Sequence, residues 1–106
     1  MSAVKYQLVL QFPCRSIDDF DAMIEMETEI SEVLGDTAEV DGHDAGSGEM
    51  NIFIFTSKPV KTFSATKDLL KRNGWLNKTT AAYREVQGEG YTVVWPRNSK
   101  EAFKVI

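Results

Sequence analysis

Apolar and polar residues alternate at positions 5–12 of the chain. A period of two sends successive side chains to opposite faces of a strand, so this segment is predicted to be a strand with one face in the core. Pro13 ends it, because proline has no backbone N–H for the next ladder hydrogen bond. The core-facing set is Tyr6, Leu8, Leu10 and Phe12.

The pattern then changes to a helical period, which predicts an amphipathic helix from Ser16 to Gly35. The Ser16 hydroxyl can accept from a first-turn amide, and Asp19 follows three residues later, as in a capping box. Gly35 is the expected terminator, because glycine adopts the left-handed conformation without strain. Glu27 falls closer to the apolar stripe than the other glutamates of this segment. The stripe consists of Ile17, Phe20, Met23, Ile24, Ile30 and Leu34.

Two strands separated by glycines are predicted next. Residues 37–43 form the weaker strand, and residues 44–48 form a loop, since their glycines supply the positive φ of a reversal. Residues 50–55 are apolar in both registers, which is typical of a strand in the middle of a sheet. This pattern does not determine which of the two faces meets the helices.

A second helix is predicted from Pro59 to about Asn73, with Gly74 as its terminator. Lys71 and Arg72 lie at the negative end of its dipole, where cations are favoured. Its inner stripe consists of Val60, Phe63, Thr66, Leu69 and Leu70.

Two strands, residues 81–86 and 91–95, are predicted in the last part of the chain, joined by a short connection that contains glycines. The pattern leaves open whether residues 80–95 are one strand or a hairpin. Pro96 ends the second strand, and the chain beyond it has room for one helical turn.

The predicted order is β-α-β-β-α-β-β in a single α+β domain over residues 1–106. This order resembles the ferredoxin-like split βαβ sandwich, in which two helices cover one face of an antiparallel sheet. Here the last strand would be extended into a hairpin. The resemblance covers almost the whole chain and rests on element order, and such a widespread fold does not imply a function.

The face of the sheet opposite the helices is predicted to be apolar. It would carry Val9 together with either Phe53 and Phe55 or the alternate set of the same strand. Two helices on one face cannot cover a strand that is apolar on both sides, and such a face is unlikely to be left in water. We therefore expect Val9, Phe53 and Phe55 to form an interface with a second copy or another protein.

Composition places the chain among ordinary globular proteins of the cytoplasm. The 106 residues are 42% hydrophobic and 26% charged, which argues against long disorder. Cys14 is the only cysteine, so no disulfide within the chain is possible, as is usual in a reducing compartment. The first residues lack the pattern of a secretory signal, and no apolar run is long enough to span a membrane.

The net charge of −4 is unevenly distributed. Residues 1–57 carry 12 acidic and 2 basic side chains, and residues 58–106 carry 4 acidic and 10 basic ones. One interpretation is that the two charged faces attract one another within the fold, and the other is an acidic surface that attracts a basic partner protein. Phe53 and Phe55 alternate as aromatics do in RNA-binding sheets, but without an electropositive groove no nucleic-acid binding is expected.

His43 is the only histidine and the leading candidate for chemistry. A carboxylate from Asp44 or Glu49 could orient it as a general base. The simpler interpretation is a solvated histidine at the end of a hairpin. The glycines nearby lead into a strand rather than a helix, so they do not predict a phosphate loop, and no metal or cofactor is expected.

Arg84 and Cys14 are the remaining candidates. Arg84 could clamp a carboxylate of an acidic substrate with two hydrogen bonds, or pair with a glutamate across the sheet. Cys14 precedes a helix N-terminus, which favours a reactive thiolate, but no resolving cysteine exists and the simpler interpretation is an inert thiol.

Two functions remain open at this stage. The first is a non-enzymatic interaction module that forms homodimers or binds a protein partner through the sheet face. The alternative is a small dimeric enzyme, of the cofactor-free monooxygenase or hydrolase type, that uses His43 with nearby carboxylates.

Overall fold

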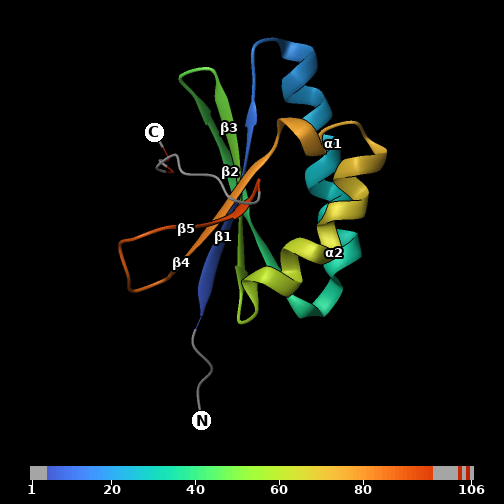
Figure 1. Ribbon diagram of the computed structural model, residues 1–106. Coiled ribbons are helices and arrows are strands. Elements are labelled where there is room, and N and C mark those ends of the chain that lie inside the picture. The colour runs from blue at the N-terminus through green and yellow to red at the C-terminus, as the bar shows by residue number, and fades with distance from the viewer. Residues whose placement is uncertain (1–4, 97–102, 104, 106) are drawn as a thin grey trace.

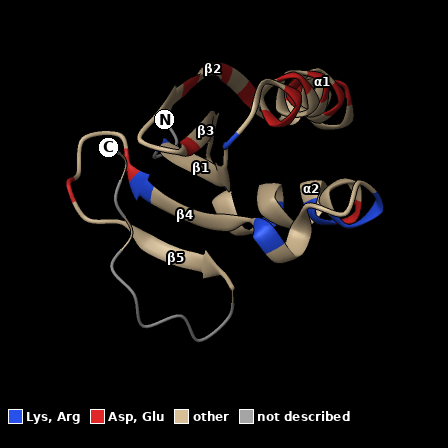
Figure 2. Ribbon diagram, turned by 90° about the horizontal axis from the view of Figure 1, so that it is seen from above, with Lys and Arg blue, Asp and Glu red and all other residues tan. Residues whose placement is uncertain are grey.

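The computed structural model of the protein describes residues 5–96, 103 and 105. It shows an α+β fold with one five-stranded antiparallel sheet, in the order β2-β3-β1-β4-β5. Both long helices, α1 and α2, pack on the same face of this sheet (Figure 1). In the view from above the two helices lie beside one another, and the β4–β5 connection lies on the other side of the sheet (Figure 2).

Strand β1 (Tyr6–Pro13) and helix α1 (Ile17–Leu34) form where the periodicity predicts them. The Ser16 hydroxyl accepts from the Asp19 amide at 3.1 Å, and the Asp19 carboxylate accepts from the Arg15 amide at 3.1 Å. The first bond satisfies an orphan donor of the helix start, and the second resembles the reciprocal half of a capping box, displaced by one residue from Ser16 to Arg15. Gly35 ends the helix with φ 52° and begins a 3₁₀ turn (Gly35–Thr37).

Strand β2 (Glu39–Gly46) is longer than the sequence predicts, and the expected loop over residues 44–48 is wrong. Ala45 and Gly46 pair with the start of β3, so the reversal needs only two residues, Ser47 and Gly48. Both have positive φ, 54° and 78°, which is the backbone of a type I′ hairpin turn. Pairing with β3 overrides the loop tendency of a glycine-rich segment.

Strand β3 (Glu49–Thr56) lies between β2 and β1, and its register decides the face that the sequence leaves open. Ile52 and Ile54 pair with Leu10 and Leu8, and all four belong to the core beneath the helices. Phe53 and Phe55 therefore lie on the opposite face of the sheet, because side chains alternate along a strand.

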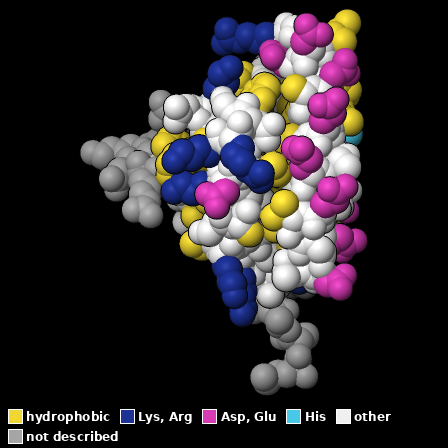
Figure 3. All heavy atoms as spheres, turned by 90° about the vertical axis from the view of Figure 1, so that its right-hand side faces the viewer, with side chains coloured by type: hydrophobic (Ala, Val, Ile, Leu, Met, Phe, Trp, Pro, Cys, Tyr) yellow, Lys and Arg dark blue, Asp and Glu magenta, His cyan; other side chains and the backbone are white. Residues whose placement is uncertain are grey.

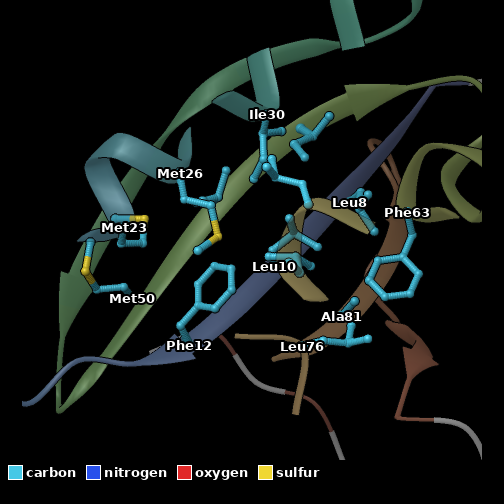
Figure 4. Packing of buried hydrophobic residues seen from close by; sticks show 14 of the residues in the cluster. Leu8, Leu10, Phe12, Met23, Met26, Ile30, Met50, Phe63, Leu76 and Ala81 are labelled. Carbon is cyan, nitrogen blue, oxygen red and sulfur yellow. The ribbon is translucent and has the colours of Figure 1, made fainter. Parts of the chain in front are cut away.

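The main core fills the space between the sheet and the helices (Figure 4). Three methionines, Met23 and Met26 of α1 and Met50 of β3, pack near Phe12 at one end of it. Phe63 of helix α2 (Pro59–Arg72) lies at the other end, near Leu8 and Ala81. Flexible thioethers suit this position, because methionine fills irregular gaps between a helix and a sheet.

The end of the chain forms a hairpin rather than one long strand. A short 3₁₀ turn (Leu76–Lys78) leads from α2 into β4 (Thr80–Glu85), which pairs with β5 (Thr92–Trp95). The register shifts between Ala81 and Ala82, which marks a bulge. The helical turn expected beyond Pro96 falls outside the described residues. No helix in the described part of the chain is long and apolar enough to cross a membrane.

Candidate functional site

His43 lies on the edge strand β2, on the side that faces helix α1. Its neighbour on β3 is the core residue Ile52, whereas Asp44 is opposite Asn51 on the other face of the sheet. Glu49 lies at the hairpin turn, opposite Gly46. The structure therefore does not bring Asp44 or Glu49 to His43, because strand alternation and register separate them.

The carboxylate partner of His43 comes from helix α1 instead. The Nδ1 atom of His43 lies 3.1 Å from both Oε1 and Oε2 of Glu27, and the Phe20 ring meets the imidazole edge to face at 5.9 Å. The two side chains of the ion pair are 31% and 19% exposed. The position of Glu27 close to the apolar stripe was the sequence signal for this contact, but sixteen residues separate the two partners.

A carboxylate that accepts from Nδ1 fixes the histidine ring and leaves Nε2 as the atom for proton transfer. The pair is only partly exposed, however. Hollows of about 890, 420 and 380 Å³ lie on the surface of the described residues, and His43 does not line these three. Within residues 5–96, 103 and 105, no cluster of three His, Cys, Asp or Glu side chains is placed to hold a metal ion.

The guanidinium of Arg84 binds backbone carbonyls of its own β4–β5 hairpin. Its Nη1 atom donates to the carbonyls of Glu85, Val86 and Gly88 at 3.1, 2.9 and 3.1 Å. Its guanidinium carbon also lies 6.0 Å from the centre of the Tyr91 ring. These contacts join the guanidinium to three backbone carbonyls of the turn, so the observed role of Arg84 is to close the β4–β5 connection.

Cys14 is half-buried between β1 and α1. Its backbone amide donates to the Gly48 carbonyl at 2.8 Å, and its Sγ lies 3.9 Å from the Ser16 carbonyl. Both contacts attach the end of β1 to neighbouring backbone. They give the thiol a structural setting and no acid–base partner among the described residues.

The sheet face away from the helices is less exposed than the sequence suggests. Val9 and Ala82, which pair with one another across β1 and β4, are both 0% exposed, and Asn51 is buried beside them. Phe53 and Phe55 of β3 are half-buried. Val9 lies on this face, as the alternation predicts, but its side chain is fully buried, so the accessible aromatic surface lies on β3.

The described residues beyond β5 include Phe103 and Val105. Both are half-buried, and the Phe103 ring lies 5.0 Å from the ring of Tyr91, the residue that approaches Arg84. Because Arg84 pairs with Gln7 on the outer face, this aromatic pair lies on the same side of the sheet. The Tyr91–Phe103 contact thus adds aromatic side chains to the β4–β5 half of the outer face, and Phe53 and Phe55 on the β3 half are partly exposed.

Comparisons with protein-family models, with curated proteins and with solved structures find no match to this chain. Function is therefore inferred from the residues of the chain and their geometry.

Proposed function

We propose that this chain is a non-enzymatic protein-interaction module of the cytoplasm that forms homodimers through an outer-face patch, defined as Phe53 and Phe55. The observation that carries the proposal is the partial exposure of two aromatic side chains on β3, on the sheet face opposite the helices. Aromatic residues supply much of the binding energy of protein interfaces when a partner covers them.

The surroundings of the patch support this role. The cross-strand neighbours of Phe53 are Val9 and Gly42, so Phe53 lies at the apolar centre of the patch. Because Gly42 has no side chain, a partner can approach the ring from that side. Phe55 lies between Gln7 and Glu39, and the ammonium of Lys5 is 6.0 Å from its ring centre. An apolar centre with a polar border is the usual anatomy of an interface.

The proposal includes the ferredoxin-like sandwich as the scaffold. In the observed order β3 lies between β1 and β2, and β1 lies between β3 and β4, which is the interleaving of a split βαβ pair. Strand β5 would then be an addition beside β4. Strand β5 widens the sheet on the side away from the patch, so the patch of Phe53 and Phe55 lies toward one edge of the outer face.

The test is light scattering coupled to size exclusion over a wide concentration range, with Phe53→Glu as the interface variant. A buried phenylalanine contributes about 1.5–3 kcal/mol, so the variant is expected to weaken the dimer by a factor of about ten or more while circular dichroism stays unchanged. Val86→Glu is the matched control, since Val86 is 40% exposed and lies outside the patch. A wild-type protein that remains monomeric at every concentration would contradict the proposal.

The contact between His43 and Glu27 supports a second candidate, a small enzyme that uses this pair as an oriented base. A substrate would have to approach Nε2 from the surface of α1 and β2. Fragment screening followed by NMR distinguishes the two functions: ligands that shift the resonances of His43 and Phe20 together favour the enzyme. A screen in which only the Phe53–Phe55 region responds contradicts it.

A further inference from the structure

The outward surface of the two helices divides its charge between them. Helix α1 contains seven acidic residues and no basic one, whereas α2 contains Lys61, Lys67, Lys71 and Arg72 against Asp68 alone. Seen from the helix side, the acidic side chains run along one edge of this surface and the basic ones gather over the other helix (Figure 3). We call this surface the helix layer.

These charges are not neutralised by direct pairing within the fold. Among the described residues the only ion pair is Glu27 with His43, which faces the β2 edge. Asp21, Glu25 and Glu32 are exposed, and their spacing of four and seven residues places them on one face of α1. Like charges on one helix face are destabilising, so the fold carries an electrostatic cost that it does not offset by pairing.

Apolar side chains accompany the charges on the same surface. Val33 of α1 and Val60 of α2 are 49% and 54% exposed. A hollow of about 380 Å³ lies at one end of the helix layer, where α1 ends and α2 begins, and its lining includes Val33, Lys61 and Ala65. The helix layer thus presents an acidic ridge beside a basic ridge, together with exposed valines and a partly apolar hollow at one end, and a second pair of helices can pack on such a surface.

We propose that the helix layer docks against the helix layer of a second copy of this chain. The argument is charge complementarity under two-fold symmetry. An axis that lies in the interface and runs along the helices places α1 of each copy on α2 of the other, so each acidic-to-basic contact forms twice. The other in-plane two-fold axis, across the helices, places like charges on one another, so charge selects the orientation.

This inference goes beyond the proposed function, because the helix layer and the patch of Phe53 and Phe55 lie on opposite faces of the molecule. Contacts between exposed charges weaken with salt, since the screening length falls from about 30 Å at 0.01 M to about 3 Å at 1 M. The aromatic patch does not depend on salt in this way. Two symmetric interfaces on opposite faces also extend an assembly, so low salt is expected to produce species larger than a dimer.

The experiment uses two charge-reversed proteins, each in a Phe53→Glu background that removes the sheet interface. The first reverses the acidic ridge with Asp21→Lys, Glu25→Lys and Glu32→Lys. The second reverses the basic ridge with Lys61→Glu, Lys71→Glu and Arg72→Glu. All six positions are exposed, and circular dichroism verifies that both proteins fold.

Sedimentation is then measured at about 20 mM and about 500 mM salt, where screening differs strongly. Each reversed protein is expected to be monomeric, because its reversed ridge then has the same sign as its other ridge, and two such copies repel one another. An equimolar mixture is expected to form a 1:1 complex at low salt and to lose at least about tenfold in affinity at high salt. A control with Glu85→Lys and Glu89→Lys changes charge outside the helix layer and is expected to behave as its parent.

The outcomes separate this inference from the proposed function. If the Phe53→Glu parent is monomeric at low salt, or if the mixture does not associate, the helix-layer inference is overturned and the sheet interface stands. If wild-type association is unaffected by Phe53→Glu but is abolished by either charge reversal, the sheet interface fails and the helix layer stands.

Discussion

The imidazole of His43 and the carboxylate of Glu27 connect the edge strand β2 to helix α1, with Nδ1 at 3.1 Å from both carboxylate oxygens. Most of the β2 strand is exposed, and its neighbour in the sheet is β3 alone. The pair is thus a tertiary contact that holds the edge of the sheet against the helix.

The first prediction concerns this pair. Glu27→Ala and His43→Ala are each expected to lower the free energy of unfolding, and a double-mutant cycle is expected to give a coupling of about 0.2–1 kcal/mol, as for partly exposed ion pairs. Urea unfolding at about neutral pH measures it. Glu25→Ala, on the outward face of the same helix, serves as the uncoupled control; additive effects of the first two changes would contradict the contact.

The second prediction concerns the turn between β2 and β3. Ser47 has φ 54°, a conformation that asparagine tolerates better than serine, and Asn-Gly is the preferred pair for a type I′ turn. Ser47→Asn is therefore expected to stabilise the protein by up to about 1 kcal/mol, a rise of a few degrees in Tm. Thermal unfolding followed by circular dichroism measures the change.

Gly48→Ala provides the opposite control for the same turn. A Cβ at Gly48 meets no atom within 4 Å, so any loss of stability comes from its φ of 78° rather than from a clash. An equal effect of both substitutions would show that the turn is not of this type.

The third prediction concerns Arg84. Arg84→Lys keeps the charge, but the lysine side chain is one bond shorter, so its ammonium does not reach the position from which Nη1 contacts three backbone carbonyls. The substitution is expected to cost about 1.5–3 kcal/mol, the range of hydrogen bonds from charged groups. The hydrogen-exchange rates of the β4–β5 backbone amides are expected to increase, whereas those of the β1 amides stay unchanged. Gln87→Ala, a substitution at an exposed position of the same connection, is expected to have no such effect.

The fourth prediction compares the two faces of β3. Ile54 is 0% exposed beneath the helices and Phe53 is half-buried on the outer face. Ile54→Glu places an unpaired carboxylate in the core, so it is expected to prevent stable folding, whereas Phe53→Glu leaves a folded chain. Circular dichroism and the dispersion of the NMR spectrum measure both; two folded variants would mean that the register of β3 is wrong.

Local pattern was sufficient for most elements of this fold. The alternation at residues 5–12 predicts β1, and the helical period with Ser16 and Gly35 at its ends predicts α1. The turn between β2 and β3 could not be predicted in the same way. Gly46 and Gly48 favour a loop locally, and only the pairing of Ala45 and Gly46 with β3 extends the strand to the turn. Strand pairing is a non-local interaction, and it can override the tendency of a short segment.

The sequence by itself determined both helices, the strands β1 and β3 and the separation of charge between the two halves of the chain, since each depends on residues that are close in sequence; it left the hairpin of residues 80–95 open. The tertiary structure alone decided which face of β3 enters the core, because both of its faces are apolar and only packing against the helices distinguishes them. It also decided that His43 meets Glu27 rather than Asp44, and that Val9 is buried. Those outcomes depend on which distant segments lie on the same face of the sheet. The hydrophobic periodicity of a segment reports its local structure and does not predict such contacts.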